Sequence, residues 1–181
     1  MNIVLIGYRC SGKTTLGKLL VSHLKMKFVD TDHLIEAKTG LPIPSYVSQN
    51  GWKDFRVVER KVIEEVAAKD NIVIATGGGV VVDMENVKNL RKNGWVVWLD
   101  TEVPVIRERM KNAQNSGELR PPLSGTDPLD EIDAILKERR PFYERASYYR
   151  VDTNRRPPQK VLEVIMGALP QCHKNSLAGG G

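Results

Sequence analysis

Short runs of apolar and β-branched residues recur along the chain and predict the strands of a sheet. In residues 71–76 almost every position is apolar, which is typical of a strand buried on both faces of a parallel sheet. A glycine or an aspartate follows each run, as expected where a strand ends. The five predicted strands cover residues 3–6, 27–29, 71–76, 95–99 and 148–151.

The segments between these runs carry apolar residues at helical spacing. Leu16, Leu19, Leu20 and Leu24 form one such stripe after the first strand. Because strands and helices alternate, we expect an α/β fold in which helices flank a five-stranded parallel sheet. The other predicted helices cover residues 33–38, 45–49, 52–68, 84–92, 104–111, 127–139 and 158–169.

The chain has 181 residues, enough for one domain with a sizeable core. We expect this domain to span residues 1–169 and to include a helical region at residues 33–68. Residues 112–125 are mostly polar, contain glycine and proline and show no periodicity, which predicts a mobile lid. Residues 170–181 lack a core pattern, and we expect a disordered tail.

Composition and charge narrow the class of protein. Hydrophobic residues make up 41% of the chain and charged residues 27%, which are ordinary values for a globular protein. No apolar run approaches the roughly 20 residues that span a bilayer, and the first strand begins at once, so we expect a cytoplasmic protein with no signal peptide and no membrane partner. The net charge is +5, but its cations are scattered and no nucleic-acid-binding motif occurs, so we expect small anionic ligands rather than nucleic acid.

The strongest motif follows the first strand. Residues 7–14 read Gly-Tyr-Arg-Cys-Ser-Gly-Lys-Thr and match the phosphate-binding pattern G-x-x-x-x-G-K-[ST]. In this pattern the loop N–H groups and the positive end of the following helix face phosphate oxygens, the lysine contacts the β- and γ-phosphates, and the hydroxyl ligates Mg²⁺. A simple glycine turn is the alternative. We predict nucleotide contacts from Cys10, Ser11, Gly12, Lys13, Thr14 and Thr15.

Three further features each have a structural alternative. Asp32, close to the end of the second strand, faces the same crevice as the loop in an α/β sheet, or it caps the next helix. Arg56 and Glu59 bind a ligand or form a surface ion pair. The three glycines at residues 77–79 bring bare backbone against a ligand or form a flexible turn.

The two cysteines leave one question open. Cys10 lies in the loop and Cys172 in the tail, so neither a disulfide nor a zinc site is expected. The position of Cys10 beside Lys13 and a helix N-terminus would give its thiol more thiolate character than usual, but we prefer the alternative, in which Cys10 is an inert, partly buried filler of the loop.

Taken in order, these motifs resemble those of the shikimate kinases. The resemblance covers residues 3–169 and implies transfer of the γ-phosphoryl group of ATP to the 3-hydroxyl of shikimate, in aromatic amino acid biosynthesis. It also implies a P-loop fold like that of the nucleoside-monophosphate kinases, in which residues 33–68 bind the substrate. The segments that carry it are residues 7–14, 30–32, 55–56 with Glu59, 77–79, 120–121, Arg139 with 141–143, and 154–156.

The resemblance implies a role for each matching residue. Lys13, Asp32 and Arg120 would be catalytic, with Asp32 binding the shikimate hydroxyls and assisting removal of the proton. Thr14 and Asp30 would hold Mg²⁺, Asp30 through water. Arg56 and Arg139 would bind the substrate carboxylate, and the backbone of Gly78 and Gly79 would contact the substrate. Arg109, Arg120 and Arg156 would contact ATP.

We weigh three alternatives to this assignment. A gluconate kinase would not explain the triple glycine together with Arg56 and Arg139. An adenylate kinase favours glycine after the loop lysine, where this chain has Thr14. A nucleotide sensor without catalysis would be expected to lack Asp32 or one of the two arginines. We expect a monomeric enzyme.

Overall fold

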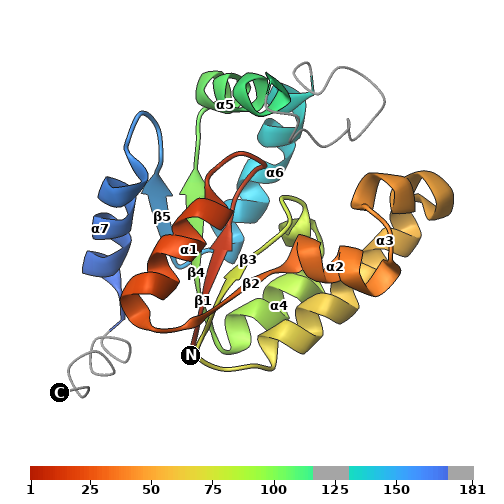
Figure 1. Cartoon of the computed structure of the whole chain (residues 1–181), viewed down its shortest axis with the longest axis horizontal. Helices are drawn as coiled ribbons and strands as arrows, with labels where there is room; N and C mark the ends of the chain where they lie inside the picture. The colour runs from red at the N-terminus through yellow and green to blue at the C-terminus, as the bar shows by residue number, and fades with distance from the viewer. Residues whose placement is uncertain (116–130, 171–181) are drawn as a thin grey trace.

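One parallel sheet organises the chain. The computed structural model describes residues 1–115 and 131–170. Its five strands lie in the order β2-β3-β1-β4-β5, and all neighbours are parallel, which confirms the predicted fold class (Figure 1). The strands are β1 (Asn2–Ile6), β2 (Lys27–Asp30), β3 (Ile72–Ala75), β4 (Gly94–Asp100) and β5 (Tyr149–Asp152).

Helices cover both faces of the sheet, because successive strand residues point to opposite sides. Ile3 and Leu5 pack with α1 and α7 on one face, whereas Val4 and Ile6 pack with α3, α4 and α6 on the other (Figure 1). The helices are α1 (Lys13–Leu24), α2 (Thr31–Thr39), α3 (Ile43–Ala67), α4 (Met84–Lys92), α5 (Val103–Asn115), α6 (Ile132–Ala146) and α7 (Pro158–Ala168). None of these helices, within the part of the chain that the structure describes, is long and apolar enough to cross a membrane.

Because β1 is the central strand, the loop that follows it lies in the middle of the row formed by the carboxyl ends of the strands. From β1 the chain crosses to the outermost strand β2, returns to β3 between β2 and β1, and then passes to β4 and β5 on the other side of β1. In open α/β sheets such a switch point leaves a crevice outside the carboxyl ends of the strands, where ligands bind. Residues that follow β1, β2 and β3 therefore converge there.

Two helices differ from their predicted bounds. The helix predicted at 127–139 continues through Pro141 to Ala146 as α6, and its predicted start lies outside the described residues. Tyr143 and Ala146 are buried against the sheet, and this packing outweighs the one backbone hydrogen bond that proline removes. The helix predicted at 104–111 continues to Asn115 as α5 and includes the first four residues of the predicted lid. The two helices predicted at 45–49 and 52–68 both occur within α3 and are separated at Gly51, which has non-helical φ 81° and ψ 166°, so this division is confirmed.

Substituting Gly17 is expected to destabilise the fold through overpacking. A Cβ built on Gly17 in α1 would lie 2.3 Å from the ring of Phe28 in β2. Overpacking of this kind typically costs about 1–3 kcal/mol, which offsets the roughly 1 kcal/mol gained when alanine replaces a helical glycine. We expect Gly17→Ala to lower the midpoint of urea unfolding.

Gly167 in α7 is the matched control for this substitution. An added Cβ there meets no atom of another described element within 4 Å. Gly167→Ala should therefore raise stability by up to about 1 kcal/mol from helix propensity. Equal effects at both positions would contradict the overpacking at Phe28.

Candidate active site

The loop after β1 encloses a cavity of about 510 Å³, here called the loop cavity. Gly7 and Gly12 adopt φ of 146° and 98°, which favour glycine and let the loop curl before α1 begins at Lys13. The Lys13 Nζ donates hydrogen bonds to the carbonyls of Gly7 at 2.8 Å and Tyr8 at 2.7 Å. The residues that line the loop cavity include Cys10, Ser11, Gly12, Lys13, Thr14, Thr15, Asp30, Arg109, Thr153 and Arg156.

The side-chain oxygens of Thr14 and Asp30 lie close together in the lining of the loop cavity. The Thr14 Oγ1 donates to Asp30 Oδ2 at 3.0 Å, while Asp30 Oδ1 accepts from the backbone N–H of Asp32 at 3.1 Å. Asp30, not Asp32, is therefore the N-cap of α2, so the capping alternative for Asp32 is wrong. Mg²⁺ prefers hard oxygen ligands and commonly uses one or two side chains besides phosphate and water. This pair fits such an ion, and no cluster of three or more His, Cys, Asp or Glu occurs among the described residues.

Arg109 joins two segments of the loop-cavity wall. Its Nη1 donates to the carbonyl of Cys10 at 3.1 Å, and its Nη2 donates to the carbonyl of Thr153 at 2.8 Å. Arg156 lies at the exposed rim, 3.9 Å from Asp152. Two of the three predicted ATP-side arginines thus line the same cavity as the loop, and the third, Arg120, lies outside the described residues.

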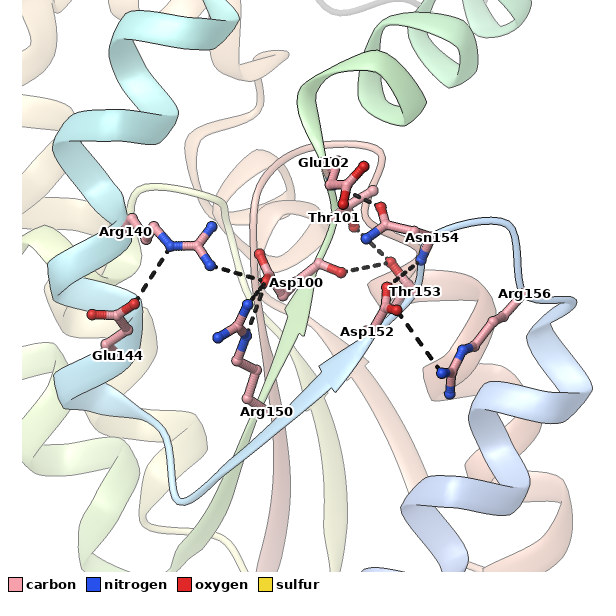
Figure 2. A network of polar contacts seen from close by, with 10 residues as sticks. All are labelled: Asp100, Thr101, Glu102, Arg140, Glu144, Arg150, Asp152, Thr153, Asn154 and Arg156. Atoms are coloured by element: carbon pink, nitrogen blue, oxygen red, sulfur yellow. Dashed lines mark hydrogen bonds and ion pairs between the residues drawn. The ribbon is translucent and has the colours of Figure 1, made fainter.

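A polar network fixes the β5 side of this wall (Figure 2). Thr153 contacts Thr101 through their hydroxyls at 2.6 Å and donates its N–H to the Asp100 carbonyl at 3.0 Å. The Asp100 carboxylate accepts from Arg150 at 2.9 Å through Nε and lies 3.3 Å from Arg140 Nη2. Because Arg140 belongs to α6, the network ties that helix to the ends of β4 and β5.

A second cavity, of about 640 Å³, lies against α3 and is here called the α3 cavity. Asp32, Arg56 and Arg139 all line it, although they come from α2, α3 and α6. Such a combination of two guanidinium groups and a carboxylate suits a small ligand that carries an anionic group and hydroxyls. The aromatic rings of Trp52 and Phe55 form part of its wall.

Glu59 holds the Arg56 guanidinium in the α3 cavity. The Arg56 Nη1 donates to Glu59 Oε2 at 2.6 Å, and Glu59 is only 1% exposed. The pair is therefore buried on the Glu59 side, and the surface ion-pair alternative is wrong. Burial raises the pKa of Glu59 above its usual value, against the opposing effect of Arg56. One of the arginine's two terminal nitrogens is thus anchored to Glu59.

The three glycines are closely packed rather than a loose turn. A Cβ on Gly77 would lie 2.7 Å from Asp32 Oδ1, and one on Gly79 would lie 2.7 Å from Arg56 Nη2. The Tyr143 hydroxyl donates to the Gly78 carbonyl at 2.5 Å. Burial raises the pKa of Tyr143, with a smaller opposing effect of Arg139, so the phenol keeps its proton. Only glycine leaves room for both charged side chains at this turn.

The two cavities meet. Asp32, Gly78 and Arg9 line both of them, so a ligand in one cavity can reach a ligand in the other past Asp32. Within the described part of the chain, every predicted site residue lines one of these cavities or both. Arg120, most of the predicted lid and all but the first residue of the predicted tail lie outside it.

Sequence reasoning missed Arg9 and the aromatic wall. Arg9 occupies a position at which the phosphate-loop pattern accepts any residue, so the pattern carries no information about it. Trp52 and Phe55 lie edge to face with their centroids 5.5 Å apart, and the Arg56 guanidinium lies 5.3 Å from the Phe55 centroid. Their placement around Arg56 in one helix was the available signal for this wall.

Comparison with known proteins agrees with this geometry. The sequence profile described as shikimate kinase matches residues 9–170. A shikimate kinase of Symbiobacterium thermophilum is 45% identical over 172 residues, covering 94% of this chain and 97% of that protein. A shikimate kinase from Acinetobacter baumannii, solved in complex with shikimate, superposes with a TM-score of 0.83 at 34% identity, covering 91% of this chain and 90% of the other.

A third relative extends the match to the whole chain. The shikimate kinase of Aquifex aeolicus is 33% identical and superposes with a TM-score of 0.76, covering 100% of both chains. The family profile covers most of the sequence, and these relatives match over nearly their full lengths. The chain belongs to the shikimate kinase family.

Proposed function

We propose that this chain transfers the γ-phosphoryl group of ATP to the 3-hydroxyl of shikimate, giving shikimate 3-phosphate and ADP. Its family is one of ATP-dependent kinases that phosphorylate a hydroxyl group, in aromatic amino acid biosynthesis. The observation that carries the proposal is the junction of the two cavities at Asp32. ATP would occupy the loop cavity, and shikimate would occupy the α3 cavity.

Binding of shikimate follows from the charges of the α3 cavity. Arg56 and Arg139 would hold its carboxylate, because planar guanidinium groups match carboxylate geometry. The backbone at Gly78 and Gly79 would contact the substrate, since no side chain stands in its way. Asp32 would accept hydrogen bonds from the ring hydroxyls and hold the 3-hydroxyl toward the loop cavity.

Phosphoryl transfer then requires positioning and charge neutralisation. The bond between the γ-phosphorus and the oxygen of ADP breaks as a bond forms to the 3-oxygen of shikimate. The proton of that hydroxyl passes to a carboxylate oxygen of Asp32. Lys13 and the loop N–H groups would neutralise the phosphate oxygens throughout, once Nζ exchanges the loop carbonyls for phosphate.

The Mg²⁺ that accompanies ATP would be held by Thr14 and, through water, by Asp30. Their oxygens already lie 3.0 Å apart, with Thr14 in the first turn of α1 and Asp30 at the end of β2. The ion would supply positive charge that neutralises the phosphate oxygens of ATP. The other ATP contacts would come from Cys10, Ser11, Gly12, Thr15, Arg109 and Arg156.

Several predictions from the sequence stay predictions. Arg120 would close over the phosphates from the lid, but Arg120 and most of the lid lie beyond the described residues. A monomeric state, a cytoplasmic location, and the absence of nucleic-acid or membrane partners also rest on the sequence alone. The reactivity of Cys10, which is half-buried, is likewise untested.

A coupled assay of ADP release tests the proposed substrate. Shikimate should support turnover, and gluconate, quinate and AMP should support little. A preference for gluconate or AMP would favour the rival kinases of this fold. Nucleotide binding without turnover on any of these acceptors would favour a sensor.

Removing either arginine that would bind the shikimate carboxylate should affect the two substrates differently. We expect Arg139→Ala and Arg56→Ala to raise the KM for shikimate and nearly spare that for ATP. A charge-assisted hydrogen bond contributes about 1.5–3 kcal/mol, so kcat/KM should fall roughly 10- to 150-fold. Arg139 is the cleaner site, because Arg56→Ala also leaves the buried Glu59 without its cation. Shikimate with an amide in place of the carboxylate should be a poor substrate for the wild type.

The amide penalty, meaning the factor by which kcat/KM falls when the amide replaces shikimate, should be smaller in both variants, since the same interaction is already lost. Arg60→Ala serves as the control, because this exposed arginine of α3 pairs with Asp83 outside both cavities. An amide penalty of equal size in the wild type and both variants would show that neither arginine contacts the carboxylate.

A further inference from the structure

Arg9 occupies the junction of the two cavities. It is the third residue of the phosphate loop, and it lines the loop cavity and the α3 cavity together with Asp32 and Gly78. Its side chain is 18% exposed, so most of the guanidinium group is withdrawn from bulk water. The backbone N of Arg9 lies 3.4 Å from the Cβ position of Gly78, which places the loop directly against the glycine turn.

The buried nitrogens of Arg9 have no hydrogen-bond acceptor in the part of the chain that the structure describes. Its Nε and Nη2 are buried, and no described residue accepts a hydrogen bond from either. Glu131 Oε2 forms an ion pair with Nη2 at 3.9 Å, but this distance is too long for a hydrogen bond, so the N–H groups stay without an acceptor among the described residues. The Tyr8 ring lies 5.6 Å from the guanidinium carbon. Since a buried cation without acceptors is costly, this arrangement points to a ligand that supplies anionic oxygens.

The position identifies which oxygens these are. Lys13 lines the loop cavity, and Arg56 and Arg139 line the α3 cavity, whereas Arg9 lines both cavities where they meet. During transfer the phosphoryl group crosses this junction with negative charge spread over its equatorial oxygens. A guanidinium group can donate to two of them at once.

We propose that Arg9 is a catalytic residue that contacts the phosphoryl group in transfer and the phosphate of the product. The inference rests on the proposed function. It makes Arg9 a contact for the reacting group itself, distinct from the carboxylate contacts at Arg56 and Arg139. The hydrogen bonds would form as the phosphoryl group leaves ADP and would persist in shikimate 3-phosphate.

The test compares Arg9→Gln and Arg9→Lys with the wild type in steady-state kinetics and calorimetry. Arg9→Gln should lower kcat by roughly 10- to 100-fold, the size of one charge-assisted hydrogen bond, and change both KM values by no more than about threefold. Its affinity for shikimate 3-phosphate should fall by a similar factor while its affinity for shikimate is kept. Arg9→Lys keeps the charge without the planar fork and should be intermediate.

Two controls exclude a structural explanation. Arg60→Gln removes an exposed arginine outside both cavities, and Glu131→Gln removes the carboxylate that faces Arg9. Both should keep kcat near that of the wild type. A loss in Glu131→Gln equal to that in Arg9→Gln would overturn the inference, because Arg9 would then act only by pairing with Glu131. If Arg9→Gln does not fold, the product and substrate affinities of Arg9→Lys decide between the same outcomes.

The remaining outcomes separate this inference from the proposed function. Unchanged kcat in folded Arg9→Gln, with an active wild type, would overturn the inference alone. A raised KM for shikimate at unchanged kcat would place Arg9 on the substrate carboxylate and would also overturn it. A wild-type protein that releases no ADP with shikimate would overturn the proposed function and the inference with it.

Discussion

Replacing Lys13 with alanine is expected to reduce turnover by about 10²- to 10³-fold while the fold is kept, the range typical of one lost transition-state contact. The Lys13 ammonium lies over the loop and is held by two carbonyls, those of Gly7 and Tyr8. ATP would offer it phosphate oxygens of full negative charge instead. The truncation removes this cation and creates no cavity in the core, because the side chain lines the loop cavity.

Lys18 provides the matched control for Lys13. It belongs to the same helix, α1, and is exposed to solvent. Lys18→Ala should leave turnover and the midpoint of thermal unfolding nearly unchanged. Near-normal turnover in purified Lys13→Ala would contradict the assignment of the loop, whereas a large drop in its unfolding midpoint would indicate that the hydrogen bonds from Lys13 to the loop are structural.

The sheet and the loop could be predicted because their signals are local. Strands such as residues 71–76 are apolar at almost every position, and the phosphate loop uses fixed residue types at fixed spacing. The course of the chain through Pro141 could not be predicted, since it depends on burial of Tyr143 and Ala146 against other elements. Tertiary packing overrides a local helix breaker there.

The sequence could predict only those site residues that belong to recognisable motifs. Asp32 had two interpretations from the sequence, and only the hydrogen bond from its N–H to Asp30 assigns the cap to Asp30. The buried side of the Arg56–Glu59 pair depends on the packing of α3 against the sheet. Arg9 carries no motif signal, and its importance emerges only from the meeting of two cavities.

Asp32→Asn should produce a loss of turnover at least as large as that at the loop lysine. The substitution keeps the size and shape of the side chain, which is 9% exposed and packed against Gly77. An amide still binds a hydroxyl but cannot take its proton. General base catalysis typically contributes 10²- to 10⁴-fold, so we expect turnover to fall by about that factor. Affinity for ATP should change by no more than about threefold, because the phosphates would be held by Lys13 and the loop.

Because Asp32 lines both cavities, the measurement must distinguish an acceptor role from a nucleotide role. Calorimetry with ATP, run beside single-turnover kinetics with shikimate, makes that distinction. Asp54→Asn is the control, since this exposed carboxylate of α3 lies outside both cavities and should change neither quantity. Lost ATP binding in a folded Asp32→Asn protein would assign Asp32 to the metal and phosphates beside Asp30. Retained ATP binding with the expected loss of turnover would instead support a role in which Asp32 takes the proton from the acceptor hydroxyl.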